Sequence, residues 1–249
     1  MWRLNCEYIL VMGLPRISCI VPARNESGHL WDLIENIKSL PEISEVVIVE
    51  GGSSDDTWTV AQDIENEFEG FVRAIQQTGR GKFNAVLDGS RICTGTLAII
   101  WDADGTVSLS DTQRILNKSL QTQSPAMGNR LLGRIHKDSM QPANWVGNWI
   151  FAFLWSPLLR SYPKDMLCGT KIFPIIIFKD LPLWLSRIDP YGDFALVAFA
   201  RSKGLKVYSV PVDYFPRTYG STNINRWRGG IQLLATTLKI YSWAIKGFK

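Results

Sequence analysis

Cysteine and histidine, the usual zinc ligands, are scarce in this chain. Its 249 residues include four cysteines and two histidines, and no Cys-x-x-Cys pair occurs. This composition argues against a zinc site of the Cys/His type. Because Cys6, Cys19, Cys93 and Cys168 lie far apart in the sequence, we expect reduced, buried thiols and a cytoplasmic protein.

Long apolar runs and the common nucleotide-binding loops are also missing. No segment reaches the roughly 18 uninterrupted apolar residues of a membrane-spanning helix. Arg3, Asn5 and Glu7 interrupt the apolar N-terminus, which makes it a poor signal peptide. Neither Gly-x-Gly-x-x-Gly nor a Walker A loop follows the first apolar run, which argues against a dinucleotide fold or a P-loop. No DNA- or RNA-reading motif is present, so no nucleic-acid partner is expected.

Acidic residues are nearly absent from the C-terminal end. From Arg201 onward the chain has nine basic residues and one acid, Asp213, although its overall formal net charge is only +4. The C-terminal part is therefore basic and the remainder acidic. This asymmetry predicts an anionic partner at the basic end, either phosphate groups or a membrane surface.

The chain does contain a series of short apolar runs that alternate with helical patterns. Runs at 17–21, 46–49, 71–75 and 97–100 predict strands, because such runs without polar alternation are typical of strands buried on both faces. Polar or glycine-containing loops follow them. The alternation predicts an α/β fold with a doubly wound, mostly parallel central sheet flanked by helices.

The last 21 residues have a pattern of their own. We expect residues 1–228 to form the α/β domain and residues 229–249 an amphipathic basic helix. Leu234, Leu238 and Tyr241 fall on one helical face with further apolar residues. The opposite face is polar and holds Gln232, Thr236, Lys239 and Lys246. Such a helix fits an anionic bilayer surface; the alternatives are packing on the domain and contact with a second subunit, and the oligomeric state is left open.

A second apolar segment covers residues 145–155. It is apolar almost all round and contains Trp145, Trp149 and Trp155. Tryptophan favours bilayer interfaces, whereas an all-round apolar helix is commonly a core helix packed against the sheet. With the basic tail, the segment favours a peripheral protein at the cytoplasmic (inner) face of a membrane.

Two carboxylates follow the fourth predicted strand. Asp102 and Asp104 lie one residue apart just beyond 97–100, so in an extended segment both side chains leave the same face. Ligands bind at the carboxyl ends of strands in open α/β sheets. Two converging carboxylates suit a hard divalent cation such as Mg²⁺ or Mn²⁺. Alone, the Asp-x-Asp motif is weak, since an exposed strand-end acid is the ordinary alternative.

Four motifs together are more specific. They are Val-Pro-Ala-Arg-Asn-Glu at 21–26, Val-Glu-Gly-Gly-Ser-Ser-Asp-Asp-Thr at 49–57, Gly-Lys at 81–82 and Asp-Ala-Asp at 102–104. The set closely resembles family 2 glycosyltransferases of the GT-A fold, and among these the dolichol-phosphate mannosyltransferases and polyprenyl-phosphate glycosyltransferases. The resemblance runs from about Ile17 to the basic C-terminal loop.

The resemblance implies an inverting, metal-dependent hexosyltransferase with a nucleotide-sugar donor of the UDP-glucose or GDP-mannose type. Asp102 and Asp104 would hold Mg²⁺ or Mn²⁺. The residues implied for donor binding are Pro22, Ala23, Asn25, Glu26, Glu50, Gly81, Lys82, Asp102 and Arg217. Of these, Arg217 lies on a late loop that would fold over the diphosphate, and with Asp104 and Asp193 it makes up the implied catalytic group.

The implied acceptor is a polyprenyl or dolichyl phosphate. Arg130 ends a segment that resembles the strand end offering an arginine to the acceptor phosphate, and Lys171 ends the segment that closes the acceptor side. Three positions depart from the family pattern. Thr106 stands in place of a frequent metal-binding glutamine, Asn223 in place of a lysine, and Trp145 where a second phosphate-binding arginine is expected.

Asp193 separates the alternatives for the acceptor. A lipid phosphate is already anionic and needs no base, whereas a soluble or lipid hydroxyl acceptor would need one, with Asp193 as the candidate. Asp193 is equally suited to cap a helix at 194–200. A non-catalytic nucleotide-sugar-binding protein is a further alternative, in which Glu26 and Glu50 are turn residues and Arg217 is a surface charge.

Overall fold

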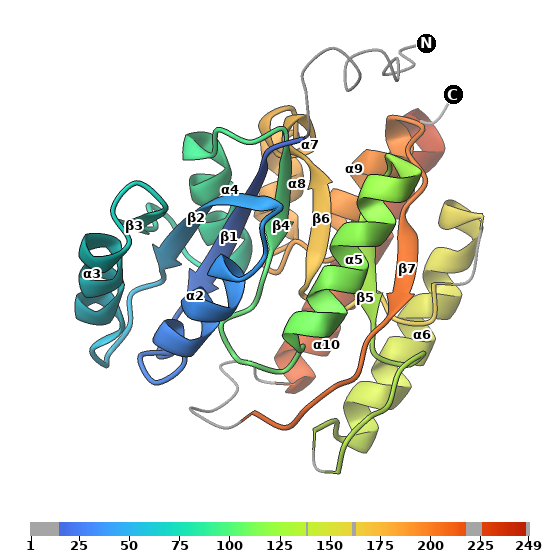
Figure 1. Cartoon of the computed structure of the whole chain (residues 1–249). Coiled ribbons are helices and arrows are strands. Elements are labelled where there is room, and N and C mark those ends of the chain that lie inside the picture. Colours follow the sequence, from blue (N-terminus) through green and yellow to red (C-terminus); the bar gives the residue numbers. More distant parts are fainter. Residues whose placement is uncertain (1–14, 138, 161–162, 218–225, 248–249) are drawn as a thin grey trace.

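The short apolar runs become strands of a seven-stranded sheet in the computed structural model (Figure 1), which describes residues 15–137, 139–160, 163–217 and 226–247. The strands are β1 (Ile17–Ala23), β2 (Ile43–Glu50), β3 (Val72–Gln76), β4 (Leu97–Ile100), β5 (Ala126–Asn129), β6 (Lys171–Pro174) and β7 (Tyr208–Pro211). The four strands predicted from the apolar runs are all present.

The sheet has the order β3-β2-β1-β4-β6-β5-β7 and is mostly parallel. Strand β1 pairs in parallel with β2 and β4, and β5 pairs in parallel with β7. Strand β6 runs antiparallel to both of its neighbours, β4 and β5. The predicted doubly wound, mostly parallel α/β fold is therefore confirmed, and β6 supplies its antiparallel exception.

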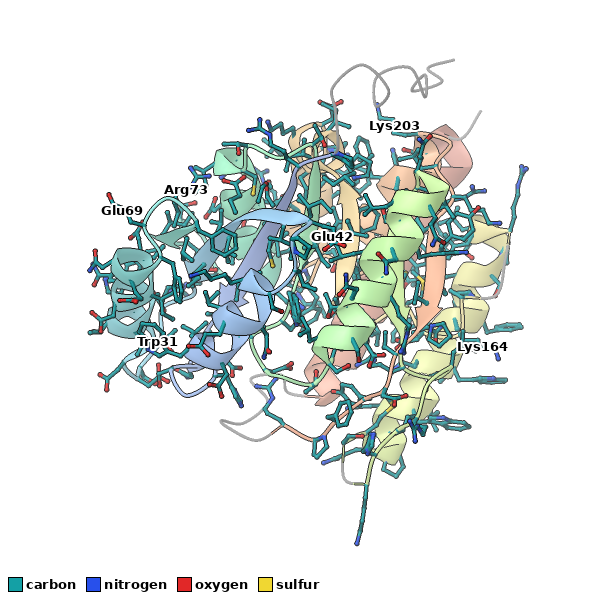
Figure 2. The ribbon with its side chains drawn as sticks, in the orientation of Figure 1. Trp31, Glu42, Glu69, Arg73, Lys164 and Lys203 are labelled. Atoms are coloured by element: carbon teal, nitrogen blue, oxygen red, sulfur yellow. The ribbon has the colours of Figure 1, made fainter. Side chains whose placement is uncertain are left out.

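Helices cover both faces of the sheet (Figure 1). One face carries α2 (Leu30–Lys38), α3 (Thr57–Glu67) and α5 (Leu109–Thr122). The other carries α4 (Lys82–Ile92), α6 (Pro142–Leu159), α7 (Ile175–Lys179), α8 (Leu183–Ile188), α9 (Ala195–Ser202) and α10 (Arg226–Gly247). Trp31 projects from α2 at the surface of the first layer (Figure 2).

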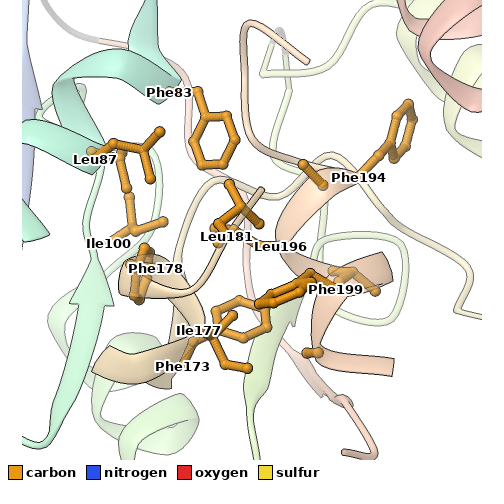
Figure 3. Close-up of a cluster of buried hydrophobic side chains, with 14 of the residues drawn as sticks. Phe83, Leu87, Ile100, Phe173, Ile177, Phe178, Leu181, Phe194, Leu196 and Phe199 are labelled. Carbon is orange, nitrogen blue, oxygen red and sulfur yellow. The ribbon is translucent and has the colours of Figure 1, made fainter. Parts of the chain in front are cut away.

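Each central strand contributes side chains to two hydrophobic cores, one on each face of the sheet. In β4, Ile99 faces the core under α2 and α5, while Ile100 faces the core under α4 and α9. Because successive side chains of a strand point to opposite faces, burial on both sides requires an apolar residue at every position. The second core is rich in aromatic rings, among them Phe83, Phe173 and Phe194 (Figure 3).

The C-terminal helix is present as α10 and packs against α6, α8 and α9, and one residue of its predicted polar face lies in this contact. Thr236, predicted on the polar face, is buried, and its hydroxyl donates a hydrogen bond of 2.5 Å to the Ile188 carbonyl. The indole of Trp155 in α6 likewise donates to the Thr237 hydroxyl, 3.2 Å away. Leu234 and Leu238 face solvent. The simple polar/apolar division was wrong for Thr236 because a threonine hydroxyl can be buried once it is hydrogen-bonded.

The described cysteines fit the expectation of buried thiols. Cys19, Cys93 and Cys168 are buried, and none is joined to another described cysteine. Burial raises the pKa of Cys93 to about 11 and that of Cys168 to about 12, so both thiols stay protonated at neutral pH. Cys6 lies outside the described residues. No helix within the described ranges is long and apolar enough to cross a bilayer.

Candidate functional site

The loops after β1 and β2 are joined to each other by side-chain hydrogen bonds. The Asn25 amide N–H donates to the Ser53 hydroxyl at 3.0 Å, and the Asn25 side-chain oxygen accepts from the Ser54 amide at 2.8 Å. Asn25 has a left-handed backbone with φ of 56°, a conformation that asparagine tolerates. The Glu26 amide donates to the Thr57 hydroxyl at 2.9 Å. The two loops thus form one rigid edge.

Pro22, Ala23 and Glu50 lie side by side at this edge. The sheet register pairs Pro22 with Val49 and Ala23 with Glu50, and the Gly51 amide donates to the Ala23 carbonyl at 2.8 Å. The Glu50 carboxylate is buried and accepts from the Ser53 amide at 2.5 Å. A buried acid at the carboxyl end of a parallel strand is well placed to meet a polar ligand.

Arg217 connects the first and fourth strand ends. It donates through Nη1 to Glu26 Oε1 at 2.9 Å and through Nη2 to Asp104 Oδ2 at 2.7 Å, although these residues lie 191 and 113 positions away. The other carboxylate oxygen of Asp104 accepts from the Thr106 hydroxyl at 2.8 Å. Thr106 therefore orients Asp104. From the sequence, Thr106 was identified only as a departure from the family pattern.

Glu26 has a second side-chain neighbour in His29. The two side chains approach to 3.2 Å between His29 Nδ1 and Glu26 Oε2. Burial raises the pKa of Glu26 and nearby Asp104 adds to this, while His29 and Arg217 act in the opposite direction without cancelling the rise. The sequence analysis did not assign His29 to the site. Its position three residues after Glu26, in the turn that leads into α2, was the signal that could have identified it.

Asp102 pairs with Lys82 at the start of α4. The Lys82 Nζ and Asp102 Oδ1 atoms are 2.5 Å apart. Burial alone would lower the pKa of Lys82, but Asp102 and Asp193 outweigh it and raise that pKa, so the ammonium stays charged. Gly81 precedes it with a φ of 89°. Gly169 lies against the pair: a Cβ atom there would lie 1.8 Å from Asp102 Oδ2, so any larger residue would displace the Asp102 and Lys82 side chains.

Lys171 and Asp193, both predicted site residues, form a buried ion pair. Lys171 Nζ donates to Asp193 Oδ1 at 2.5 Å, and the two residues are 1 % and 9 % exposed. Such a pair satisfies two charges that would be costly to bury alone. The Asp193 carboxylate is therefore held by an ammonium group rather than left available to solvent.

Asp189, not Asp193, organises the start of α9. Its buried carboxylate accepts backbone hydrogen bonds from Phe194 at 2.9 Å and Ala195 at 2.8 Å through Oδ2, and from Gly192 at 3.0 Å through Oδ1. The helix begins at Ala195 without a side-chain cap from Asp193. The N-cap alternative for Asp193 was thus wrong, because the chain folds back so that an acid five residues before Phe194 reaches its amide.

Arg130 is held in place by Asp165. Its Nε and Nη2 atoms donate to the two carboxylate oxygens at 2.7 and 2.9 Å, and its backbone amide adds a bond of 3.0 Å. Burial alone would raise the pKa of Asp165, but the Arg130 charge outweighs it and lowers that pKa. The guanidinium also lies 5.0 Å from the Tyr214 ring centroid. Arg130 is a well-ordered donor whose charge is already matched.

The carboxylate oxygens at the end of β4 fit a hard divalent cation. Asp102 and Asp104 offer carboxylate oxygens, which Mg²⁺ and Mn²⁺ prefer. Within residues 15–137 and the other described ranges, no three His, Cys, Asp or Glu side chains converge as a complete metal cage. Magnesium sites that combine one or two carboxylates with ligand phosphates and water need no such cage. Asn223, which stands in place of a lysine of the family pattern, lies outside the described residues.

Comparisons with known proteins agree on one family. The model of glycosyl transferase family 2 matches residues 18–179. The chain is 28 % identical over 227 residues to Glycosyltransferase AglJ of Haloferax volcanii, covering 88 % of this chain and 70 % of that protein. It is 26 % identical over 226 residues to dolichyl-phosphate beta-glucosyltransferase of Saccharomyces cerevisiae, covering 80 % and 66 %. The chain therefore spans about two thirds of the length of these relatives.

A solved structure shares the fold. The crystal structure of glucosyl-3-phosphoglycerate synthase from Mycobacterium tuberculosis, in complex with Mn²⁺, uridine diphosphate and glucosyl-3-phosphoglycerate, matches with a TM-score of 0.70 at 16 % identity. The match covers 96 % of this chain and 86 % of that one. At this identity the likeness concerns the fold alone, and it agrees with the predicted GT-A architecture.

Proposed function

The chain belongs to glycosyl transferase family 2, and from this premise we propose that it transfers a hexose, with inversion, from a nucleoside diphosphate sugar to a polyprenyl or dolichyl phosphate at a membrane surface. The observation that carries the proposal is the double ion pair of Arg217 with Glu26 and Asp104. It gathers acids and a guanidinium from three distant segments at one strand edge, where a charged ligand is expected to bind.

The donor half of the proposal assigns roles to this edge. Pro22, Ala23, Asn25, Glu26 and Glu50 hold the base and ribose. Arg217 and Lys82 exchange their present carboxylate partners for oxygens of the donor diphosphate. A planar guanidinium can bind a phosphate through two parallel hydrogen bonds, and the raised pKa of Lys82 keeps its ammonium charged. Both cations then stabilise the negative charge that develops on the leaving diphosphate.

Asp102 and Asp104 are the proposed metal ligands. A bound Mg²⁺ or Mn²⁺ supplies Lewis-acid neutralisation of the diphosphate. The hydrogen bond from Thr106 at 2.8 Å fixes one oxygen of Asp104, and Gly169 leaves room for the Asp102 carboxylate. These neighbours hold the two acids in position before a ligand arrives.

A phosphate acceptor fits the acceptor side better than a hydroxyl. A phosphate monoester carries about −1.5 to −2 charges at pH 7, so its oxygen attacks without help from a base. Asp193 is held by Lys171 at 2.5 Å, which disfavours it as the base that a hydroxyl would need. The yeast relative is named a dolichyl-phosphate beta-glucosyltransferase, which supports the same acceptor class. Arg130 is the proposed contact to the acceptor phosphate.

Two contacting helices present apolar side chains to solvent. On α6 these are Trp145, Val146, Trp149, Ile150 and Phe153, and on α10 they are Ile231, Leu234 and Leu238. The Tyr241 hydroxyl of α10 donates to the Leu154 carbonyl of α6, so the two helices that carry these rows pack against each other. Clustered exposed apolar residues mark interaction sites, and tryptophan suits a bilayer interface. We assign this α6–α10 surface to the membrane.

Membrane contact predicts a difference between two tryptophan variants. Trp149→Glu on α6 should lower the fraction of protein that floats with anionic liposomes several-fold, because it places a carboxylate in the lipid-facing surface. Trp31→Glu on α2 is the matched control, since the two side chains are 55 % and 38 % exposed on different layers. Equal flotation of both variants and the unmodified chain would contradict the assignment of this surface.

The donor assignment predicts stabilisation by one class of nucleotide sugar. A ligand at 100 times its Kd stabilises the folded state by about 2.7 kcal/mol. A thermal-shift panel of UDP-, GDP- and dTDP-sugars, with and without Mn²⁺, should therefore raise the Tm for at least one base, with a larger rise when Mn²⁺ is present. If no donor in the panel raises the Tm, the donor site is assigned wrongly.

A further inference from the structure

A cavity lies away from the strand edge that is proposed to bind the donor. It has a volume of about 330 Å³ and is lined from the C-terminal end of α6, from α9 and from the start of β7. In Figure 1 these elements meet at the upper right of the molecule. Strand β7 begins here at Tyr208. None of the residues that line the cavity belongs to the cluster of Asp104 and Arg217.

The lining combines an apolar floor with a cationic rim. Apolar contacts include Met127, Leu159 and Val197, while Arg160, Arg201 and Lys206 supply three positive charges. No acidic side chain is among the described residues that line it.

Arg201 has a buried donor that no described group accepts. Its Nε atom is buried without a hydrogen-bond partner, while its Nη1 donates to the Leu205 carbonyl at 3.4 Å. Buried polar atoms in folded proteins are nearly always satisfied, so the contacts within the described residues leave the Arg201 guanidinium only partly satisfied. Phosphate oxygens are the acceptors that a guanidinium fork binds best.

Helix electrostatics account for only part of this arrangement. Arg201 lies in the last turn of α9 and Arg160 caps α6, where cations interact well with the negative end of the helix dipole. Lys206 belongs to neither helix. Its ammonium lies 4.6 Å from the centroid of the Tyr208 ring, at the rim of the same cavity. The dipoles therefore explain neither Lys206 nor the orphaned Nε atom.

We propose that this cavity binds the phosphate group of a small phosphorylated ligand, with Arg201, Arg160 and Lys206 as the phosphate contacts and the apolar floor under the organic part. Its volume lies at the lower end of the range for small-molecule sites, about 300–1,000 Å³. The site is separate from the donor and acceptor sites proposed above, so it can be tested without a transfer assay. Soluble phosphate esters and lipid headgroups share this chemistry, and the experiments below distinguish them.

Phenyl phosphate is a suitable probe for the soluble form. Isothermal titration of the full chain is run with EDTA and at an ionic strength fixed with chloride, which removes metal-assisted binding at the donor edge. We expect binding that weakens about tenfold or more in Arg201→Gln, in keeping with the loss of hydrogen bonds to a charged group. Lys206→Gln, at an exposed position, provides a second variant if Arg201→Gln does not fold. Lys38→Gln on α2 is the control, because it also removes one positive charge.

Vesicles distinguish the two sources of phosphate. If the ligand is a lipid headgroup, phosphatidic acid vesicles bind the unmodified chain better than phosphatidylcholine vesicles do, and Lys206→Gln lowers that binding more than Lys38→Gln. If the ligand is soluble, phenyl phosphate shows the same dependence on the variants. Absence of both kinds of binding, or equal loss in Lys206→Gln and Lys38→Gln, overturns the site and leaves the donor assignment untouched.

Discussion

Replacing Asp104 by asparagine is expected to lower the rate of hexose transfer by a factor on the order of 10²–10³, the loss typical when one preorganised charge-stabilising group is removed. The substitution removes the charge that holds Arg217 at 2.7 Å and one of the two proposed metal ligands. Both effects act on the leaving diphosphate. The measurement is kcat for transfer from the donor identified by thermal shift to a short-chain polyprenyl phosphate.

A surface aspartate provides the control for this variant. Asp63 is exposed on α3, so Asp63→Asn makes the same chemical change far from the strand edge and should leave kcat unaltered. The Tm of both variants is measured in parallel to separate loss of chemistry from loss of fold. Transfer by Asp104→Asn at more than half the unmodified rate would remove Asp104 from the mechanism.

Lys171→Met is expected to lower the free energy of unfolding by about 3 kcal/mol, near the lower end of the cost of breaking a buried ion pair. The variant leaves the Asp193 carboxylate, only 9 % exposed, without its ammonium partner. Asp193 also helps to raise the pKa of Lys82, so a second ammonium group lies close to it, which softens the loss. Chemical denaturation at neutral pH measures the difference.

Three further variants make this prediction specific. Lys239→Met, at an exposed position of α10, should change stability by less than about 0.5 kcal/mol. The double variant Lys171→Met/Asp193→Leu should recover most of the loss, because no unpaired charge remains buried. Asp193→Asn should retain transfer to a phosphate acceptor, whereas a catalytic base at this position would lose it. Equal stability of Lys171→Met and Lys239→Met would refute the buried-pair argument.

Sequence periodicity was sufficient for the sheet core and for the position of the acids at the end of β4. The apolar run 97–100 predicted β4 because a strand buried on both faces has no polar position, and the structure places Ile99 and Ile100 in opposite cores. The position of Asp102 and Asp104 at the strand end followed directly. The family motifs likewise located Glu26 and Glu50, since each follows or ends a strand with a parallel neighbour.

Only the tertiary structure decided which charges meet. No local pattern relates Arg217 to Glu26, 191 residues earlier. Nor does any local pattern indicate that Asp189, rather than Asp193, accepts the hydrogen bonds from the amides at the start of α9. Periodicity reports which face of an element is apolar, because that depends on near neighbours in the chain. Ion pairs and buried hydrogen bonds depend on how separate elements pack, so the sequence determined the framework and the strand-end acids, while packing determined their partners.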